Sequence, residues 1–155
     1  MENNLNNPDI INDLIKINND RIAGYKRALD LAHGLELDTL RQIFANNILQ
    51  SERFIEELKP YVLREGEKPT DETMLSGKLF RMWMSIKGNI VGNDRHSLLE
   101  SCEKGEDAFK EMYKKILVED VNDLSLGACN KLLEQLSKQS ESHNEIKSLR
   151  DQVPS

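Results

Sequence analysis

Residues 7–33 read NPDIINDLIKINNDRIAGYKRALDLAH, and this stretch determines the class of fold. Its apolar positions recur at alternating steps of four and three residues, the period of an α-helix with a wide buried face. Asn7 can cap the first turn, and Pro8 suits the first helical position. The two adjacent stripes are Ile10, Leu14, Ile17, Arg21, Gly24, Ala28 and Leu31, and Ile11, Ile15, Asn18, Ile22, Tyr25, Leu29 and Ala32. The stretch therefore predicts a helix over about 8–33 that packs against other helices.

The rest of the chain repeats this helical pattern, and no segment alternates with period two between turn signals. We expect further helices over about 37–64, 73–91, 95–117 and 121–151. Two long helices, a long connection and two more long helices are the order of a bundle with one crossover. The prediction is one all-α domain over residues 1–155, a ferritin-like four-helix bundle whose long crossover carries an extra short helix.

Length and charge narrow the class of protein further. The chain has 155 residues, which suits one apolar core, and 27 acidic against 21 basic residues give a formal charge of −6. Acidic and basic residues alternate along the chain, as on solvated helix faces. This balance gives no general attraction to nucleic acid or anionic membrane. No apolar run approaches the roughly 20 residues of a membrane-spanning helix.

The cysteines and the first residues indicate a compartment. Cys102 and Cys129 do not form a CxxC pair, and the start lacks the basic and apolar regions of a secretory signal. Both thiols are then most simply free and reduced. We expect a bacterial cytoplasmic protein.

Three groups of residues resemble a known family. They are Leu14-Ile15-x-Ile17-Asn18-x-Asp20 with Tyr25, Leu75-Ser76-Gly77-Lys78 with Trp83, and Cys102-Glu103-x-Gly105-Glu106-Asp107 with Tyr113. Over about residues 12–151 the chain is similar to bacterial ferritin-like proteins described as a domain of unknown function. The resemblance implies a fold and no particular chemistry.

The two halves of the chain also echo each other weakly. The segment at Tyr25 resembles the one at Tyr113, and the segment at Ser51 resembles the one at Ser140, at nearly the same offset. Two readings stay open: chance similarity between amphipathic helices, or a duplicated helical hairpin.

Metal-binding ferritin-like proteins supply a pattern to compare. They place a Glu on the first and third helices and Glu-x-x-His on the second and fourth, because residues three apart share a helix face. The six corresponding positions hold Asn18, Ser51, Phe54, Glu106, Ser140 and His143. Only Glu106 and His143 are ligand types, too few to compensate the charge of a buried metal pair. We therefore expect no di-iron site and no cofactor.

Polar residues nevertheless fall midway along the apolar stripes. The expected central polar layer comprises Asn18, Arg21, Asn47, Ser51, Arg53 and Ser140. Such a layer is costly unless its members hydrogen-bond one another. Our hypothesis is that Arg21 or Arg53 takes the electrostatic role of the metal by pairing with Glu103 or Glu106. The alternative is a single divalent metal ion, for which Glu103, Glu106 and His143 are the candidate ligands.

The segment over residues 75–90 suggests how the chain associates. Phe80 and Met84 give it more apolar surface than one buried stripe requires, which favours a homodimer through this segment. The net acidity argues against a membrane role for its basic residues.

Three functions remain on these grounds. The leading reading is a non-catalytic bundle that acts as a binding or scaffold protein without a complete di-iron site. The alternative is an atypical metal-binding or oxidoreductase protein with a site near Glu106 and His143. The third reading is a small-ligand binder that uses a polar pocket in the middle of the bundle.

Overall fold

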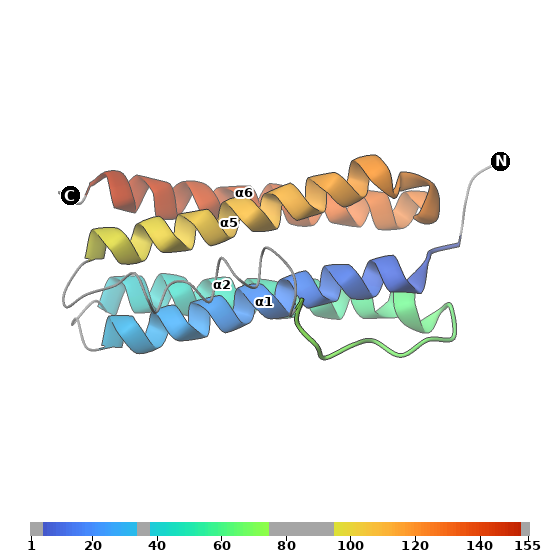
Figure 1. Ribbon diagram of the computed structural model, residues 1–155, viewed down its shortest axis with the longest axis horizontal. Helices are drawn as coiled ribbons and strands as arrows, with labels where there is room; N and C mark the ends of the chain where they lie inside the picture. The colour runs from blue at the N-terminus through green and yellow to red at the C-terminus, as the bar shows by residue number, and fades with distance from the viewer. Residues whose placement is uncertain (1–4, 34–37, 75–94, 153–155) are drawn as a thin grey trace.

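The computed structural model describes residues 5–33, 38–74 and 95–152 (Figure 1). These residues form four α-helices, α1 (Pro8–His33), α2 (Asp38–Leu63), α5 (Arg95–Glu119) and α6 (Leu126–Asp151), and one 3-10 turn, η1 (Val121–Asp123). The described part of the chain contains no strand. The all-α prediction is confirmed, and α1 begins at the proline that the sequence marks as its first residue.

The four helices form two hairpins that lie against each other. α1 packs along α2, α5 packs along α6, and the hairpins meet where α1 contacts α5 and α2 contacts α6. In Figure 1, α1 and α6 run in one direction, whereas α2 and α5 run in the other. α2 therefore ends at the opposite end of the bundle from the start of α5, and the chain between them must cross the length of the molecule.

The described part of this crossover begins with a glycine turn and then follows α1. Gly66 has φ 75°, and the Glu67 N–H donates to the Val62 carbonyl at 3.3 Å, so α2 closes with a left-handed cap. Asn12 Oδ1 then accepts from the Thr70 N–H at 2.9 Å, and Asn19 Nδ2 donates to the Glu72 carbonyl at 2.8 Å. These side chains hold the connection against the outer side of α1.

The helix expected over about residues 73–91 falls almost entirely outside the described residues. Residues 73 and 74 are not helical. Residues 75–91, including Phe80 and Met84, lie outside the described residues.

The last helix begins five residues later than the expected start at residue 121. Val121–Asp123 form η1, and Ser125 has the extended backbone of a cap, with φ −69° and ψ 161°. Its Oγ accepts from the Ala128 N–H at 3.1 Å. A serine that accepts from the third residue after it is a favoured way to start a helix, and this cap sets the boundary.

The N-terminal segment ties both hairpins together at one end of the bundle. Asn6 donates its backbone N–H to Glu65 Oε1 at 2.8 Å, after the end of α2. Its Oδ1 accepts from the Ser125 N–H at 2.8 Å, before the start of α6. The Asn7 N–H donates to the Asp123 carbonyl, also at 2.8 Å.

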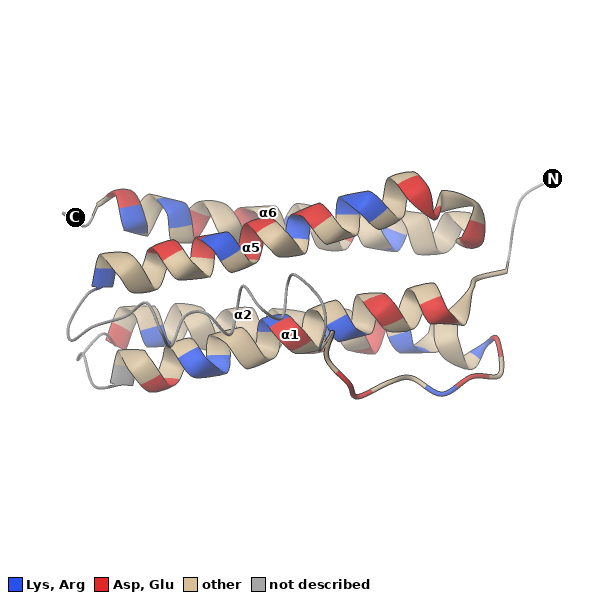
Figure 2. Cartoon of the chain, in the orientation of Figure 1, with Lys and Arg blue, Asp and Glu red and all other residues tan. Residues whose placement is uncertain are grey.

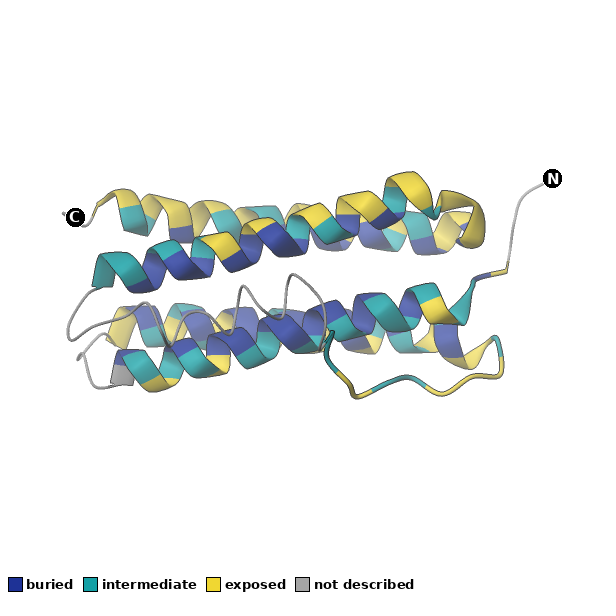
Figure 3. Ribbon diagram, in the orientation of Figure 1, coloured by how far each residue is buried: buried dark blue, intermediate teal, exposed yellow. Residues whose placement is uncertain are grey.

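The core lies along the axis between the hairpins. Figure 3 shows the buried stretches of the helices facing one another and the exposed stretches facing outward. Aromatic side chains fill the middle: the ring centroids of Tyr25 and Phe44 are 5.5 Å apart, and those of Phe109 and Tyr113 are 4.5 Å apart. Figure 2 shows acidic and basic residues interspersed along all four helices.

Candidate functional site

The centre of the bundle contains an ion pair that is completely removed from solvent. Arg21 of α1 donates from Nε to Glu106 Oε1 at 2.8 Å and from Nη2 to Oε2 at 2.9 Å, and both side chains are 0% exposed. Arg21 Nη1 also donates to Ser51 Oγ of α2 at 3.0 Å. This planar, two-pronged geometry is the strongest that an arginine and a carboxylate can form. One arginine thus links α1 to α5 and α2.

Aromatic rings enclose this pair. The Arg21 guanidinium lies 5.3 Å from the centroid of the Phe109 ring and 5.6 Å from that of Tyr25. Burial by itself disfavours the arginine cation, but the charge and hydrogen bonds of Glu106 outweigh it and raise the pKa of Arg21. Burial, together with the Glu106 charge, also raises the pKa of the Cys102 thiol. Arg21 therefore stays charged, and the Cys102 thiol is not activated.

A second set of hydrogen bonds continues the polar layer to α6. Asn18 Nδ2 donates to the Tyr113 hydroxyl at 2.8 Å, and that hydroxyl donates to Gln135 Oε1 at 2.7 Å. Gln135 Nε2 then reaches the Phe54 carbonyl of α2 at 3.2 Å. Gln139 Nε2 donates to the backbone carbonyl of Glu106 at 3.1 Å. The layer therefore joins all four helices.

Most of the residues expected in the layer lie there, and one does not. Asn18, Arg21, Asn47 and Ser51 are buried, and Ser140 is half-buried. Arg53 is exposed, and including it was wrong. It follows Ser51 by two residues, which turns it about 200° around α2 and away from the core.

Gln135 and Gln139 were missed, although the sequence contains a signal for them. Both are 0% exposed. They continue a stripe of α6 at steps of three and four residues that runs Ala128, Leu132, Gln135 and Gln139, with Ile146 two turns further on.

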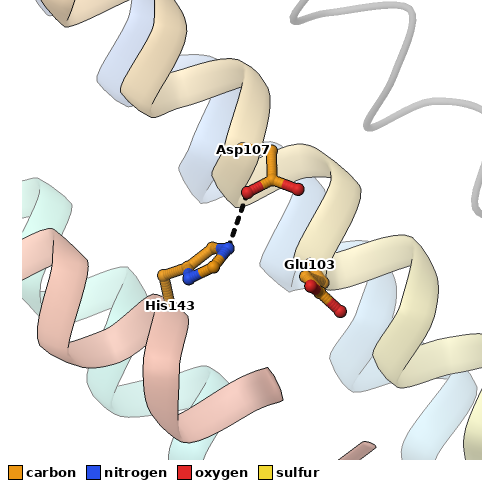
Figure 4. A group of neighbouring side chains, drawn as sticks. All are labelled: Glu103, Asp107 and His143. Atoms are coloured by element: carbon orange, nitrogen blue, oxygen red, sulfur yellow. Dashed lines mark hydrogen bonds and ion pairs between the residues drawn. The ribbon is translucent and has the colours of Figure 1, made fainter.

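The structure brings two of the three candidate metal ligands, Glu103 and His143, within 4.8 Å of each other and leaves Glu106 apart in the core. Glu106 is bound by Arg21 in the core, whereas His143 Nε2 lies 2.6 Å from Asp107 Oδ1. Glu103 pairs with Arg150 of α6. Figure 4 shows the His143 ring directed at Asp107, with Glu103 one turn earlier on α5. Sequence reasoning missed Asp107, because its contact with His143 depends on how α6 packs on α5.

The central residues do not fit a carboxylate-bridged metal pair. The position on α1 holds Asn18, which is hydrogen-bonded to Tyr113, and Phe54 of α2 is an apolar side chain that is 1% exposed. The remaining inward carboxylate, Glu106, already binds a cation. A metal pair would need several more anionic oxygens at this point.

A further buried acid, Asp20, lies where the crossover meets α1. Its Oδ1 and Oδ2 lie 3.2 and 3.3 Å from the Met74 N–H, which donates to the carboxyl group. Desolvation raises the pKa of Asp20 to about 7, although the Met74 hydrogen bond opposes the shift. This acid can therefore change charge near neutral pH.

The central pair yields a stability prediction. Arg21→Met leaves Glu106 buried without a partner, so the free energy of unfolding should fall by about 3–5 kcal/mol, whereas Arg21→Met with Glu106→Leu should recover most of the loss. Urea unfolding followed by circular dichroism measures both. Lys59→Met breaks the surface pair with Glu56, and should cost less than about 1 kcal/mol. Equal losses of unfolding free energy in Arg21→Met and Lys59→Met would contradict this prediction.

Asp20 yields a prediction about pH. Its pKa in the folded chain is raised from 3.8 to about 7, so the folded state holds the proton more tightly than the unfolded state. The contribution of Asp20 to stability is present below pH 4 and is lost as the pH rises to about 7. Asp20→Asn retains an acceptor for Met74, so its stability relative to the natural chain should increase between pH 4 and pH 7. Asp71→Asn, an exposed change in the same connection, controls for the lost charge. Parallel curves of unfolding free energy against pH for Asp20→Asn and the natural chain would contradict the prediction.

Comparison with known proteins supplies a family. Among the described residues, no helix combines the length and apolar character needed to cross a membrane. No curated protein and no solved structure matches the chain. Residues 7–119 match a family model, and this match ends with α5, whereas the resemblance was expected to run to about residue 151. The match covers well over half of the sequence, and the chain therefore belongs to the family described as Domain of unknown function (DUF2383).

Proposed function

We propose that this chain is a non-catalytic ferritin-like bundle that acts as a binding or scaffold protein in the bacterial cytoplasm. The observation that carries the proposal is the buried Arg21–Glu106 pair, which fills the centre where ferritin-like enzymes hold their metals. A guanidinium supplies there the positive charge that metal ions would otherwise supply. The chain thereby keeps a bundle that is stable without a cofactor.

The buried carboxylates already have partners within the protein, which supports this proposal. Among the described residues, Asp20 and Glu106 are the buried carboxylates. Glu106 is bound by Arg21, and Asp20 accepts from the Met74 backbone. Neither is free to bridge two metal ions. The crossover between α2 and α5, which run in the same direction, supports the ferritin-like topology.

A metal assay tests the central part of this proposal. Protein purified after growth with iron and then given Fe²⁺ in air should not hold an oxygen-bridged iron pair. Its rate of Fe²⁺ oxidation should equal that of protein-free buffer, which absorbance of the ferric product measures. Faster oxidation that disappears in Glu106→Gln would overturn the proposal.

The proposed scaffold is a homodimer formed through residues 75–90. The support is the sequence alone, where Phe80 and Met84 add a second apolar side to the segment. The described surface offers a control region of similar character, because Val121 and Leu126 at the turn between α5 and α6 are 44% and 56% exposed.

Two matched variants test the dimer. Phe80→Asp should convert the dimer to a monomer, because a carboxylate cannot be buried in an apolar interface without a partner. Val121→Asp with Leu126→Asp should leave the dimer intact. Light scattering after size-exclusion chromatography gives the mass, and circular dichroism checks the helicity. A dimer lost only in the second variant would locate the interface elsewhere.

A further inference from the structure

We propose that Glu103, Asp107 and His143 bind one divalent transition-metal ion at the outer side of the contact between α5 and α6. One ligand atom from each residue lies within 4.8 Å of the other two. Two of the residues are one helical turn apart on α5, and the third approaches from α6 (Figure 4). A bound ion would therefore link α5 to α6 at a point separate from the Arg21–Glu106 pair.

The ligand types define the class of ion. An imidazole with two carboxylates suits Zn²⁺, Mn²⁺ or Fe²⁺, whereas Ca²⁺ and Mg²⁺ prefer oxygen ligands alone. Three protein ligands leave at least one coordination position for water. Because Glu106 is 0% exposed and bound by Arg21, it takes no part, and the site is independent of the proposed function of the core.

The geometry around His143 already brings two ligand atoms to a distance at which one bound cation can bridge them. A separation of 2.6 Å between Nε2 and Asp107 Oδ1 requires a hydrogen-bonding proton between these atoms. A metal ion would replace that proton. The His143 side chain is 13% exposed, so the packing of α6 restricts the directions in which the ring can turn. Its Nδ1 lies 3.5 Å from Asn144 Oδ1, and Nε2 is the ring nitrogen that faces Asp107.

The Arg150 guanidinium competes with the metal ion for Glu103. Its guanidinium pairs with Glu103, whose side chain is 12% exposed. The same guanidinium also contacts Asp151 Oδ1, from Nη2 at 2.9 Å and from Nε at 3.2 Å. Arg150 therefore keeps a carboxylate partner when Glu103 turns to a metal ion.

Zinc titration of the full chain, freed of metal with a chelator, tests the site. Calorimetry should show one Zn²⁺ per chain, and His143→Ala or Asp107→Asn should weaken binding by at least about tenfold. His96→Ala is the matched control, because His96 of α5 also faces an acid, with Nδ1 3.8 Å from Glu100 Oε2, and should leave binding unchanged. Arg150→Met should tighten binding, because it removes the competing cation.

A spectroscopic readout separates this site from binding elsewhere. The chain has 3 histidines, and in NMR spectra only the ring signals of His143 should shift on addition of Zn²⁺. Circular dichroism of each variant confirms that it is folded. Zinc binding that survives in His143→Ala, the absence of zinc binding to the natural chain, or shifts confined to His33 and His96 would each overturn the proposal.

Discussion

A buried charge must have a partner, and this requirement organises the molecule around Arg21. A guanidinium without water costs several kcal/mol unless a carboxylate and further acceptors replace its hydration. Glu106 supplies two acceptors and Ser51 a third, and the rings of Phe109 and Tyr25 lie against the cation. The pair joins the two hairpins at a point where apolar side chains alone would allow them to slide.

The same constraint fixes how the helices are aligned. A shift of α1 along α5 by one turn moves Arg21 about 5.4 Å and separates both charges from their partners. The hydrogen bonds from Asn18 through Tyr113 to Gln135 impose the same alignment on α6. Apolar packing supplies most of the stability of such a bundle, and the polar layer selects one arrangement among those that bury the same apolar area.

Helical periodicity in the sequence predicts the fold well and the site in part. The stripes of α1 predict its burial, and the helix expected over about 37–64 ends at Leu63 in the structure. The sequence also suggests an arginine paired with a glutamate at the centre, but leaves two candidates for each. Arg21 and Glu106 lie on the core stripes, whereas Arg53 lies off its stripe, so helix geometry decides that choice. Asp107 could not be found in this way, because an exposed residue gains its partner only from the rotation of α6 against α5. The serine cap of α6 also places the start of this helix at Leu126, later than the expected start at about residue 121.

The central claim is that Arg21 and Glu106 form a closed, water-free pair in the folded protein. The most direct test is the rate at which the Arg21 Nε–H proton exchanges with water, measured by ¹⁵N-resolved NMR and assigned with Arg21→Lys. The account predicts a resolved signal that exchanges far more slowly than that of the exposed Arg53 and that shifts in Glu106→Gln. An Arg21 Nε–H proton that exchanges as fast as that of Arg53, or whose signal does not shift in Glu106→Gln, would contradict this claim.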